Sequence, residues 1–441
     1  MYTDLLKEKI SDFHARPLPS YTPRDYKISF IDDMSFSITG PRRCGKTYRT
    51  YQFVEDYIAK GNSIENICRI QFNDHKLIKL RSEDLGMIDE AYYALYPEKK
   101  EHREEVIFIF DEIHRIDGWE DYILHLLDTP HHKVIITGST SKIQKGEIAS
   151  ALRGKNFNRE ILPFSFREFM RHHGRSSNIR TSEDKAYARK LFTMYITQGS
   201  FPGLLNSSSD DHSEILENYW NTMLLRDIVE ANQREEKIDI LQLETFAQYL
   251  INRTSLPMTV RRVMEGMKKD NYPISSAKAY NYLKYLEDAF IIFPIHFYSM
   301  SEKIRRSNYT KIYAIDWKLA DTIATGGNID ITRQFENIIY LELRRRNNKV
   351  CYFKTRDNYE IDFVAQNKKT RTPPDLYQVC YDISSSDTLE RETRSIEKSF
   401  EYLNAKSATI ITLADEKVIK RKNITINIIP AWKWLLSTAP F

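Results

Sequence analysis

The sequence is poor in cysteine and in the residues that break regular structure. Its 441 residues include four cysteines, 14 glycines and 15 prolines. The cysteines (Cys44, Cys68, Cys351 and Cys380) lie far apart and form no C-x-x-C pair, which argues against a disulfide framework or a zinc site. The apolar run AFIIFPIHF is too short to span a bilayer, and the start MYTDLLKEKI is charged rather than signal-like. These absences predict a cytoplasmic protein that does not enter a membrane.

Neither sign of charge dominates the chain. Lysine and arginine total 65 and aspartate and glutamate total 61, so the formal net charge is +4. A dispersed excess of this size permits contact with nucleic acid but does not argue for it. The length exceeds that of one ordinary core and predicts two to four domains.

Residues 40–47 read GPRRCGKT, which has the G-x-x-x-x-G-K-[ST] form of a phosphate-binding loop (P-loop). The apolar segment FSIT before it predicts a strand, and the pattern after it predicts a helix that ends at Gly61. A Gly-bounded turn is the alternative, but such a turn does not require these flanks. In a P-loop the Lys46 ammonium reaches the β- and γ-phosphates of ATP, and the Thr47 hydroxyl binds Mg²⁺. The predicted nucleotide-binding residues are Gly40, Pro41, Arg42, Arg43, Cys44, Gly45, Lys46, Thr47 and Tyr48.

A second element supplies acidic residues. The apolar run 106–110 has the length of a buried parallel strand and ends in Asp111 and Glu112. We predict that Asp111 holds Mg²⁺ through water and that Glu112 polarises the attacking water. Acidic pairs end many strands, so the prediction depends on the P-loop upstream.

Three further segments predict the rest of a sheet. The segment KVIITGSTSKI predicts a strand followed by Ser139 and Thr140, either of which is a candidate sensor of the γ-phosphate. An ordinary polar strand end is the alternative. The segments NICRIQFN and FNREILP predict two more strands. Five strands with helices between them predict an α/β fold with a doubly wound, mostly parallel sheet.

The order of these motifs resembles that of the prokaryotic AAA-type ATPases related to archaeal ATPases, whose C-terminal domain is similar to PD-(D/E)XK nucleases. The segments that carry the resemblance are GPRRCGKT, FDEIHRIDGWE, TGSTSKI, LRGKNFNREILPFSFREFM, GSFPGLL, YLEDAFIIFPI, KIYAIDWKLA and FENIIYLELRRR. The resemblance implies an arginine finger that acts on the nucleotide of a neighbouring subunit in a homo-oligomer. Arg153 matches best and Arg159 next. A helix-capping or solvent-facing arginine is the alternative.

The domains that we predict are a P-loop core (1–170), a helical lid (171–237), a winged helix (238–330) and a nuclease-like domain (331–441). His172 and His173 fall in a charged stretch and are expected to be solvated. Three helices and two strands, joined by the basic segment SEKIRRSNYT as the wing, make up the winged helix. The DNA-binding candidates are Lys278, Lys284, Lys303, Arg305 and Arg306. A winged helix that only packs against other domains is the alternative.

The predicted nuclease-like domain departs from the nuclease motif in one segment. Asp362 stands where the motif requires an aspartate, and Glu336 matches the acid on the preceding helix. The E-x-K of the motif is replaced by Gln378, Val379 and Cys380, and glutamine is a weak ligand for a hard cation. We therefore predict a degenerate domain, while Glu360 is a substitute acid that would keep cleavage open.

The predicted function is Mg²⁺-dependent ATP hydrolysis by a protein that acts on or with DNA, in genome maintenance or anti-phage defence. Two alternatives are a nucleotide-state switch that controls a protein effector and an ATP-regulated DNA nuclease. DNA, a second copy of the chain and a protein effector are the predicted partners.

Overall fold

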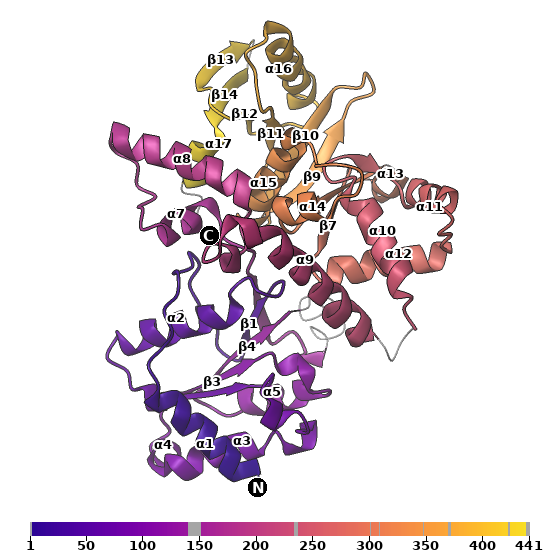
Figure 1. Cartoon of the computed structure of the whole chain (residues 1–441). Helices are drawn as coiled ribbons and strands as arrows, with labels where there is room; N and C mark the ends of the chain where they lie inside the picture. The colour runs from indigo at the N-terminus through magenta and orange to yellow at the C-terminus, as the bar shows by residue number, and fades with distance from the viewer. Residues whose placement is uncertain are drawn as a thin grey trace. The chain divides into compact units, whose positions relative to one another are not determined.

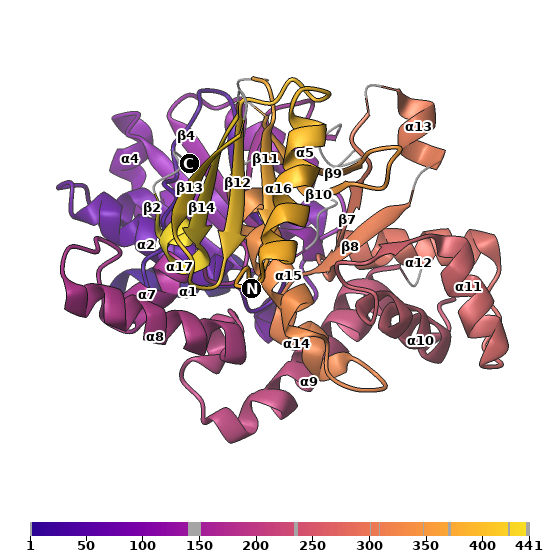
Figure 2. The ribbon, with the colours of Figure 1, turned by 90° about the horizontal axis from the view of Figure 1, so that it is seen from above.

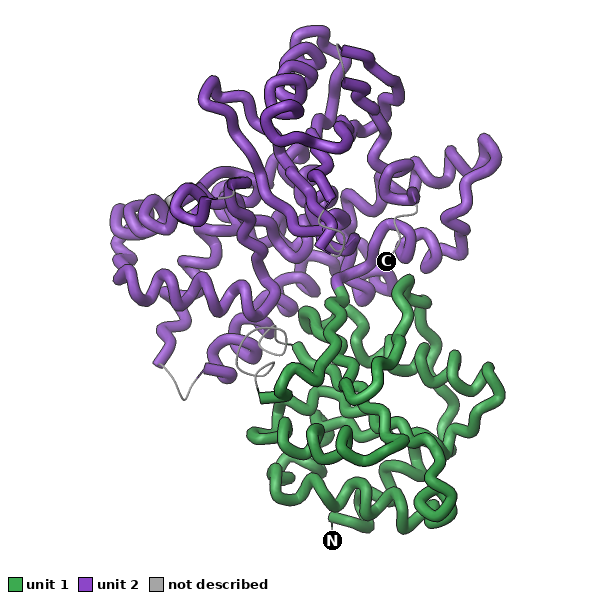
Figure 3. The backbone as a smooth tube through the Cα atoms, turned by 180° about the vertical axis from the view of Figure 1, so that it is seen from behind, with its two compact units in different colours: residues 1–161 green, residues 162–441 purple. Residues whose placement is uncertain are grey.

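The computed structural model describes residues 2–139, 151–232, 237–299, 301–307, 309–346, 348–368, 372–421 and 424–437. The chain divides into two compact units, residues 1–161 and residues 162–441 (Figure 3).

The first unit is built on a five-stranded sheet in the order β2-β3-β4-β1-β5, and every neighbouring pair is parallel. Its strands are β1 (Ser35–Thr39), β2 (Ile67–Gln71), β3 (Val106–Asp111), β4 (His132–Gly138) and β5 (Asn156–Glu160). Its helices are α1 (Tyr2–Ala15), α2 (Lys46–Ile58), α3 (Met87–Leu95), α4 (Pro97–Glu101) and α5 (Trp119–Leu127). The prediction of a parallel α/β sheet is confirmed.

Helices cover both faces of this sheet. In β3, Phe108 and Phe110 pack with α1, α3 and α5, whereas Ile107 and Ile109 pack with α2 on the other face. Figure 1 shows α2 on one side of the sheet and α1 and α3 on the other. Successive side chains of a strand point to opposite faces, so a strand covered on both faces is apolar throughout. Because the strands are parallel, the residues that end β1, β3 and β4 meet at one edge of the sheet.

The second unit contains most of the helices. They are α7 (Phe166–His172), α8 (Ser182–Gln198), α9 (His212–Thr222), a π-helix (Met223–Glu230), α10 (Ile240–Ile251), α11 (Val260–Lys269), α12 (Ser276–Asp288), α13 (Glu302–Ser307), α14 (Trp317–Ile323), α15 (Ile331–Arg345), α16 (Ser386–Phe400) and α17 (Ala431–Leu436). Among the described residues, no helix combines the length and the apolar character that crossing a bilayer requires.

Two sheets belong to the second unit. The small antiparallel sheet has the order β6-β8-β7, and its strands are β6 (Pro257–Met258), β7 (Ile292–His296) and β8 (Thr310–Ala314). The larger sheet has the order β13-β14-β12-β11-β10-β9. Its strands are β9 (Asn348–Lys354), β10 (Glu360–Asn367), β11 (Asp375–Val379), β12 (Ser407–Thr412), β13 (Lys417–Arg421) and β14 (Ile424–Pro430). Figure 2 shows α16 lying along one face of this larger sheet. Helices α15 and α17 contact the strands on its other face.

The segment between β7 and β8 differs from the expected wing loop, because residues 302–307 form α13. The Ser301 Oγ accepts a hydrogen bond from the backbone N–H of Ile304, and the Ser301 carbonyl accepts one from Arg305. A serine at this position caps a helix, and Glu, Lys, Ile and Arg can all continue it. The basic segment predicted as the wing therefore contains a short helix, and the winged helix stays a prediction.

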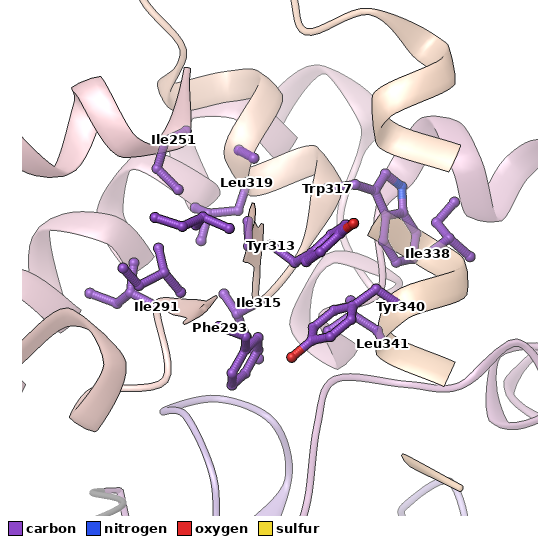
Figure 4. Close-up of a cluster of buried hydrophobic side chains, with 14 of the residues drawn as sticks. Ile251, Ile291, Phe293, Tyr313, Ile315, Trp317, Leu319, Ile338, Tyr340 and Leu341 are labelled. Carbon is purple, nitrogen blue, oxygen red and sulfur yellow. The ribbon is translucent and has the colours of Figure 1, made fainter. Parts of the chain in front are cut away.

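One hydrophobic core runs through the second unit from Leu162 to Leu436. Figure 4 shows its centre, where β7, β8, α14 and α15 bring aromatic and aliphatic side chains together. The rings of Tyr313 and Tyr340 stack with centroids 4.3 Å apart. Segments 171–237, 238–330 and 331–441 all contribute to this core, and the domain boundaries within it stay a prediction.

Candidate nucleotide-binding site

The P-loop connects β1 to α2 through a backbone that only glycine allows at two positions. Gly40 has a φ of 151°, and a Cβ there would lie 2.1 Å from the carbonyl oxygen of Ile161. Gly45 has a φ of 94° and immediately precedes α2. Both glycines of the motif are thus required by the backbone itself.

Lys46 is buried at the start of α2. Its ammonium donates hydrogen bonds to the carbonyl oxygens of Gly40 (3.1 Å) and Pro41 (2.9 Å). The same Nζ lies 3.7 Å from Oε1 of Glu112. A buried ammonium needs such partners to offset the loss of water, and here they hold its charge against the inner side of the loop.

Asp111 is fully buried at the end of β3, and three side chains fix its carboxylate. Oδ2 accepts hydrogen bonds from the Thr47 hydroxyl (2.9 Å) and from Nη2 of Arg69 (3.0 Å). Oδ1 accepts one from the Thr137 hydroxyl (2.5 Å). The structure thus brings together Thr47 and Asp111, the two residues predicted to hold Mg²⁺.

Glu112 has a left-handed backbone, with φ 60° and ψ 37°. This conformation is uncommon for a residue with a Cβ, and such residues cluster at active sites and ligand-binding segments. The Glu112 backbone N–H donates to the Thr137 hydroxyl oxygen (3.0 Å), which secures the turn. Oε2 of Glu112 is buried and accepts no hydrogen bond from any residue that the structure describes.

Burial favours a higher pKa for the Glu112 carboxyl, but the positive charges around it, that of Lys46 first among them, together outweigh burial and hold the pKa below its usual value. The imidazole Nε2 of His114 lies 3.6 Å from Oε2 of Glu112. Burial lowers the pKa of His114, and Lys46 contributes the largest of the charges that lower the pKa of Glu112. Glu112 is therefore ionised at neutral pH, as a general base must be.

Arg69 and Thr137 contact Asp111 but were missed by the sequence analysis. Arg69 lies in the apolar strand β2, and its guanidinium lies 4.6 Å from the centre of the Tyr51 ring. A lone arginine in a buried strand signals a buried acidic partner, because such a charge must be paired. Thr137 gives a weaker signal, since threonine is common in strands.

The structure describes one of the two predicted sensor residues. Ser139 is buried just beyond the end of β4, and Thr140 lies outside the described residues. The hydroxyl that contacts Asp111 on this strand comes from Thr137, two residues before Ser139.

The two candidate finger residues differ in exposure. Arg153 is exposed and has a φ of 50°. Arg159 is partly buried on β5, with its guanidinium 4.8 Å from the centre of the Phe157 ring. Tyr48, at the end of the predicted nucleotide-binding residues, is also exposed.

The DNA-binding candidates lie on two helices of the second unit. On α12, Lys284 is exposed and Lys278 is partly buried. On α13, Lys303 is exposed and Arg305 is partly buried, while the side chain of Arg306 lies outside the described part.

The nuclease-like candidates come together in the larger sheet. Asp362 on β10 accepts a hydrogen bond from the backbone N–H of Val379 (2.9 Å), and its own N–H donates to Oε1 of Gln378 (3.3 Å). Lys311 lies within 3.5 Å of a carboxylate oxygen of both Glu336 and Asp362. Among the described residues, no group of three or more acidic, histidine or cysteine side chains is arranged to hold a metal ion.

The fold and the site define an AAA-type P-loop protein, and the family model described as an AAA domain matches residues 32–170. A second model, described as a domain of unknown function (DUF8612), matches residues 189–327. Neither of these two models reaches residues 331–441.

The chain belongs to the same family as the uncharacterized protein MJ1544 of Methanocaldococcus jannaschii. The two are 31% identical over 427 residues, which cover 94% of this chain and 91% of that protein. An uncharacterized protein of Haemophilus influenzae is 25% identical over 342 residues, which cover 77% of this chain and 81% of that protein. The Walker-type ATPase PABY2304 of Pyrococcus abyssi superposes with a TM-score of 0.42 at 13% identity, covering 66% of this chain and 91% of that one.

Proposed function

We propose that the protein binds ATP with Mg²⁺ at the P-loop and hydrolyses it, with Glu112 as the general base. The observation that carries this proposal is the buried Glu112 carboxylate, whose Oε2 accepts no hydrogen bond from the described residues. Its other oxygen lies 3.7 Å from the P-loop ammonium of Lys46. A buried acceptor without a hydrogen bond is costly, and a nucleophilic water could donate one to it.

The oxygen atoms beside the loop fit a magnesium ion. The Thr47 hydroxyl and the Asp111 carboxylate are hard ligands whose oxygens lie 2.9 Å apart. When bound, Mg²⁺ would neutralise charge on the phosphates of the nucleotide. Lys46 would add a second positive charge there, and Glu112 would accept a proton from water at Oε2. Thr137 supports both acids, because it donates to Asp111 and accepts from the backbone of Glu112.

Measurement of ATP hydrolysis by the purified full-length chain, beside the Lys46→Ala variant, tests the proposal. Hydrolysis by the wild-type protein that Lys46→Ala abolishes supports it. Equal rates for the two proteins would show that the activity comes from a contaminant, and would contradict the proposal.

We propose Arg153 as a finger that acts on the nucleotide of a neighbouring copy. It is exposed and rests on a left-handed backbone next to Gly154, so its side chain is open to a partner. Fingers of this kind contribute on the order of 10³-fold to the rate of P-loop enzymes.

If Arg153 acts in this way, turnover per chain should rise with protein concentration as oligomers form, and Arg153→Ala should abolish the rise. The measurement is ATPase rate against concentration, with light scattering to follow the oligomer. Arg159→Ala is the matched control, since Arg159 is partly covered by its contact with the Phe157 ring. Unchanged turnover in Arg153→Ala would leave this arginine with a structural role.

We propose DNA as the partner of residues 238–330. Its elements run α10, β6, α11, α12, β7, α13 and β8, an order that supports a winged helix with a short helix added in the wing, and it presents the exposed Lys284 and Lys303. A cytosolic location agrees with four cysteines that are all free and buried. A nucleotide-state switch that controls a protein effector is the second candidate.

The double substitution Lys284→Ala and Lys303→Ala should weaken binding to duplex DNA. Log affinity falls with log salt concentration, and each lost phosphate contact makes this fall less steep by about 0.9. Losing both contacts should therefore reduce the steepness by roughly 2. Fluorescence anisotropy over a salt series measures this slope. Lys417→Ala with Lys420→Ala, two exposed lysines on β13, is the matched control. No binding by the wild-type protein even at low salt would favour the protein effector.

A further inference from the structure

Lys311 is a buried lysine at the centre of an acidic cluster. It lies on β8, the middle strand of the small sheet, and is 2% exposed. Its Nζ lies 2.7 Å from Oε1 of Glu360, 3.3 Å from Oε1 of Glu336 and 3.5 Å from Oδ1 of Asp362. Glu336 comes from α15, and the two other acids come from β10. One ammonium group therefore contacts three carboxylates from two elements.

Two of the acids have further hydrogen-bond partners besides Lys311. The Tyr313 hydroxyl donates to Oε1 of Glu336 (2.6 Å), and the Val379 backbone N–H donates to Oδ2 of Asp362 (2.9 Å). The Gln378 side chain is also engaged, because its Nε2 donates to Oε2 of Glu392 (2.7 Å) and its Oε1 accepts from the backbone N–H of Asp362. Gln378 therefore does not face the three acids as a third ligand.

Electrostatics explains why the lysine is needed. If all three carboxylates were ionised, they and one ammonium would carry a formal charge of −2, which favours a proton on one of the acids. Burial, and next the charge of Glu336, raise the pKa of Asp362 to about 8, although Lys311 opposes the rise. Without Lys311 the three acids would face one another with no counter-charge, which a buried site tolerates poorly.

The resemblance of residues 331–441 to PD-(D/E)XK nucleases implies a divalent cation held by Glu336 and Asp362. The residues present do not fit one. The space that such an ion would share between these carboxylates is taken by the Lys311 Nζ, and no described group of acids is arranged to hold a metal. Glu360 is the closest partner of the lysine, so it is not a free substitute acid.

We propose that Lys311 takes the place of the divalent cation, so that the acidic cluster is an internal ion-pair cluster that joins the small sheet to α15 and β10. This assignment is independent of the proposed ATPase activity. It explains how the domain keeps the acids of a nuclease without the E-x-K: the positive charge comes from a strand outside residues 331–441. It also excludes metal-dependent phosphodiester cleavage at this cluster.

The test counts manganese ions bound by the full-length chain without nucleotide, using the electron paramagnetic resonance signal of free Mn²⁺. The wild-type protein and Asp362→Asn should bind the same number of ions. Lys311→Met should bind about one more ion per chain, and the double substitution Lys311→Met with Asp362→Asn should lose it. Lys354→Met is the matched control, because Lys354 lies opposite Glu360 in the β9–β10 ladder but is exposed. This control should bind as the wild-type protein does.

Three results would overturn the proposal. One is a manganese site in the wild-type protein that Asp362→Asn removes, a comparison that stands even if Lys311→Met fails to fold. Another is a folded Lys311→Met protein that gains no ion. The third is Mn²⁺-dependent cutting of supercoiled DNA that is robust in the wild-type protein and lost in Asp362→Asn. Cutting that stays at background, with or without ATP, supports the proposal.

Discussion

The Glu112→Gln protein is expected to bind ATP about as tightly as the wild-type protein and to hydrolyse it at least about 100-fold more slowly. General bases contribute typically 10² to 10⁴ in rate, and glutamine keeps the size of the side chain but cannot accept the proton. The left-handed backbone of Glu112, the proposed base, and the hydrogen bond from its N–H to the Thr137 hydroxyl fix the position of this residue. Single-turnover phosphate release and binding of a fluorescent ATP analogue separate the two effects.

Lys46→Ala should fail in a different way. It removes the ammonium that lies within the P-loop, so nucleotide binding itself should weaken and hydrolysis should fall with it. Glu105→Gln is the matched control for the base. Glu105 is exposed and immediately precedes the first residue of β3, whereas Glu112 follows the last. Equal hydrolysis by the wild-type protein and Glu112→Gln would contradict the assignment of the base, even if Lys46→Ala still lost binding.

Lys311→Met should lower the free energy of unfolding of residues 162–441 by about 3–5 kcal/mol. Removing one partner of a buried ion pair costs this much, because it leaves charge that is buried and uncompensated. Adding Asp362→Asn to Lys311→Met should recover part of the loss, since it removes one of the acids left without a counter-charge. Lys354→Met, at an exposed position, should stay within about 0.5 kcal/mol of the wild-type protein.

Tryptophan fluorescence during urea unfolding measures this effect in the right part of the chain. Trp220, Trp317, Trp432 and Trp434 lie in the second unit, and Trp119 alone lies in the first. Equal stability of Lys311→Met and the wild-type protein would show that the cluster contributes no net stability. In that case, the number of bound Mn²⁺ ions would still test separately whether Lys311 takes the place of a divalent cation.

The same variants should change how stability depends on pH. Burial and the charge of Glu336 raise the pKa of Asp362 from its usual 3.8 to about 8 in the folded protein. Between these values the folded state holds a proton that the unfolded state releases, so the contribution to stability falls as pH rises from about 4 to 8. Lys311, Glu360 and Tyr313 also face this carboxyl. Unfolding midpoints at several pH values should show a fall that Asp362→Asn removes, and an identical slope in both proteins would contradict the shift.

The nucleotide site was predictable from sequence because its signals are local. The loop from Gly40 to Thr47 is contiguous in sequence. The helix after it has the apolar spacing of an element buried on one face, and the strand before it is buried on both faces. The acidic pair after the strand at 106–110 was predicted on the same basis. The inner strand β3 was predictable for the same reason, since a strand covered on both faces is apolar along its length. The edge strand β5 (NFNRE) is polar and partly exposed, and so gives a weaker signal.

Only the tertiary structure decided which side chains meet the acids of each site. Arg69 and Thr137 contact Asp111 from neighbouring strands of the sheet. Lys311 precedes Glu336 by 25 residues and Asp362 by 51 residues, and no local pattern connects a lysine in one small strand with acids on a later helix and strand. The sequence by itself determined the elements and the motifs within them, because both depend on neighbouring residues and on burial. The pairing of charges between distant elements depended on packing, because only the folded chain removes those groups from water and makes each of them need a partner.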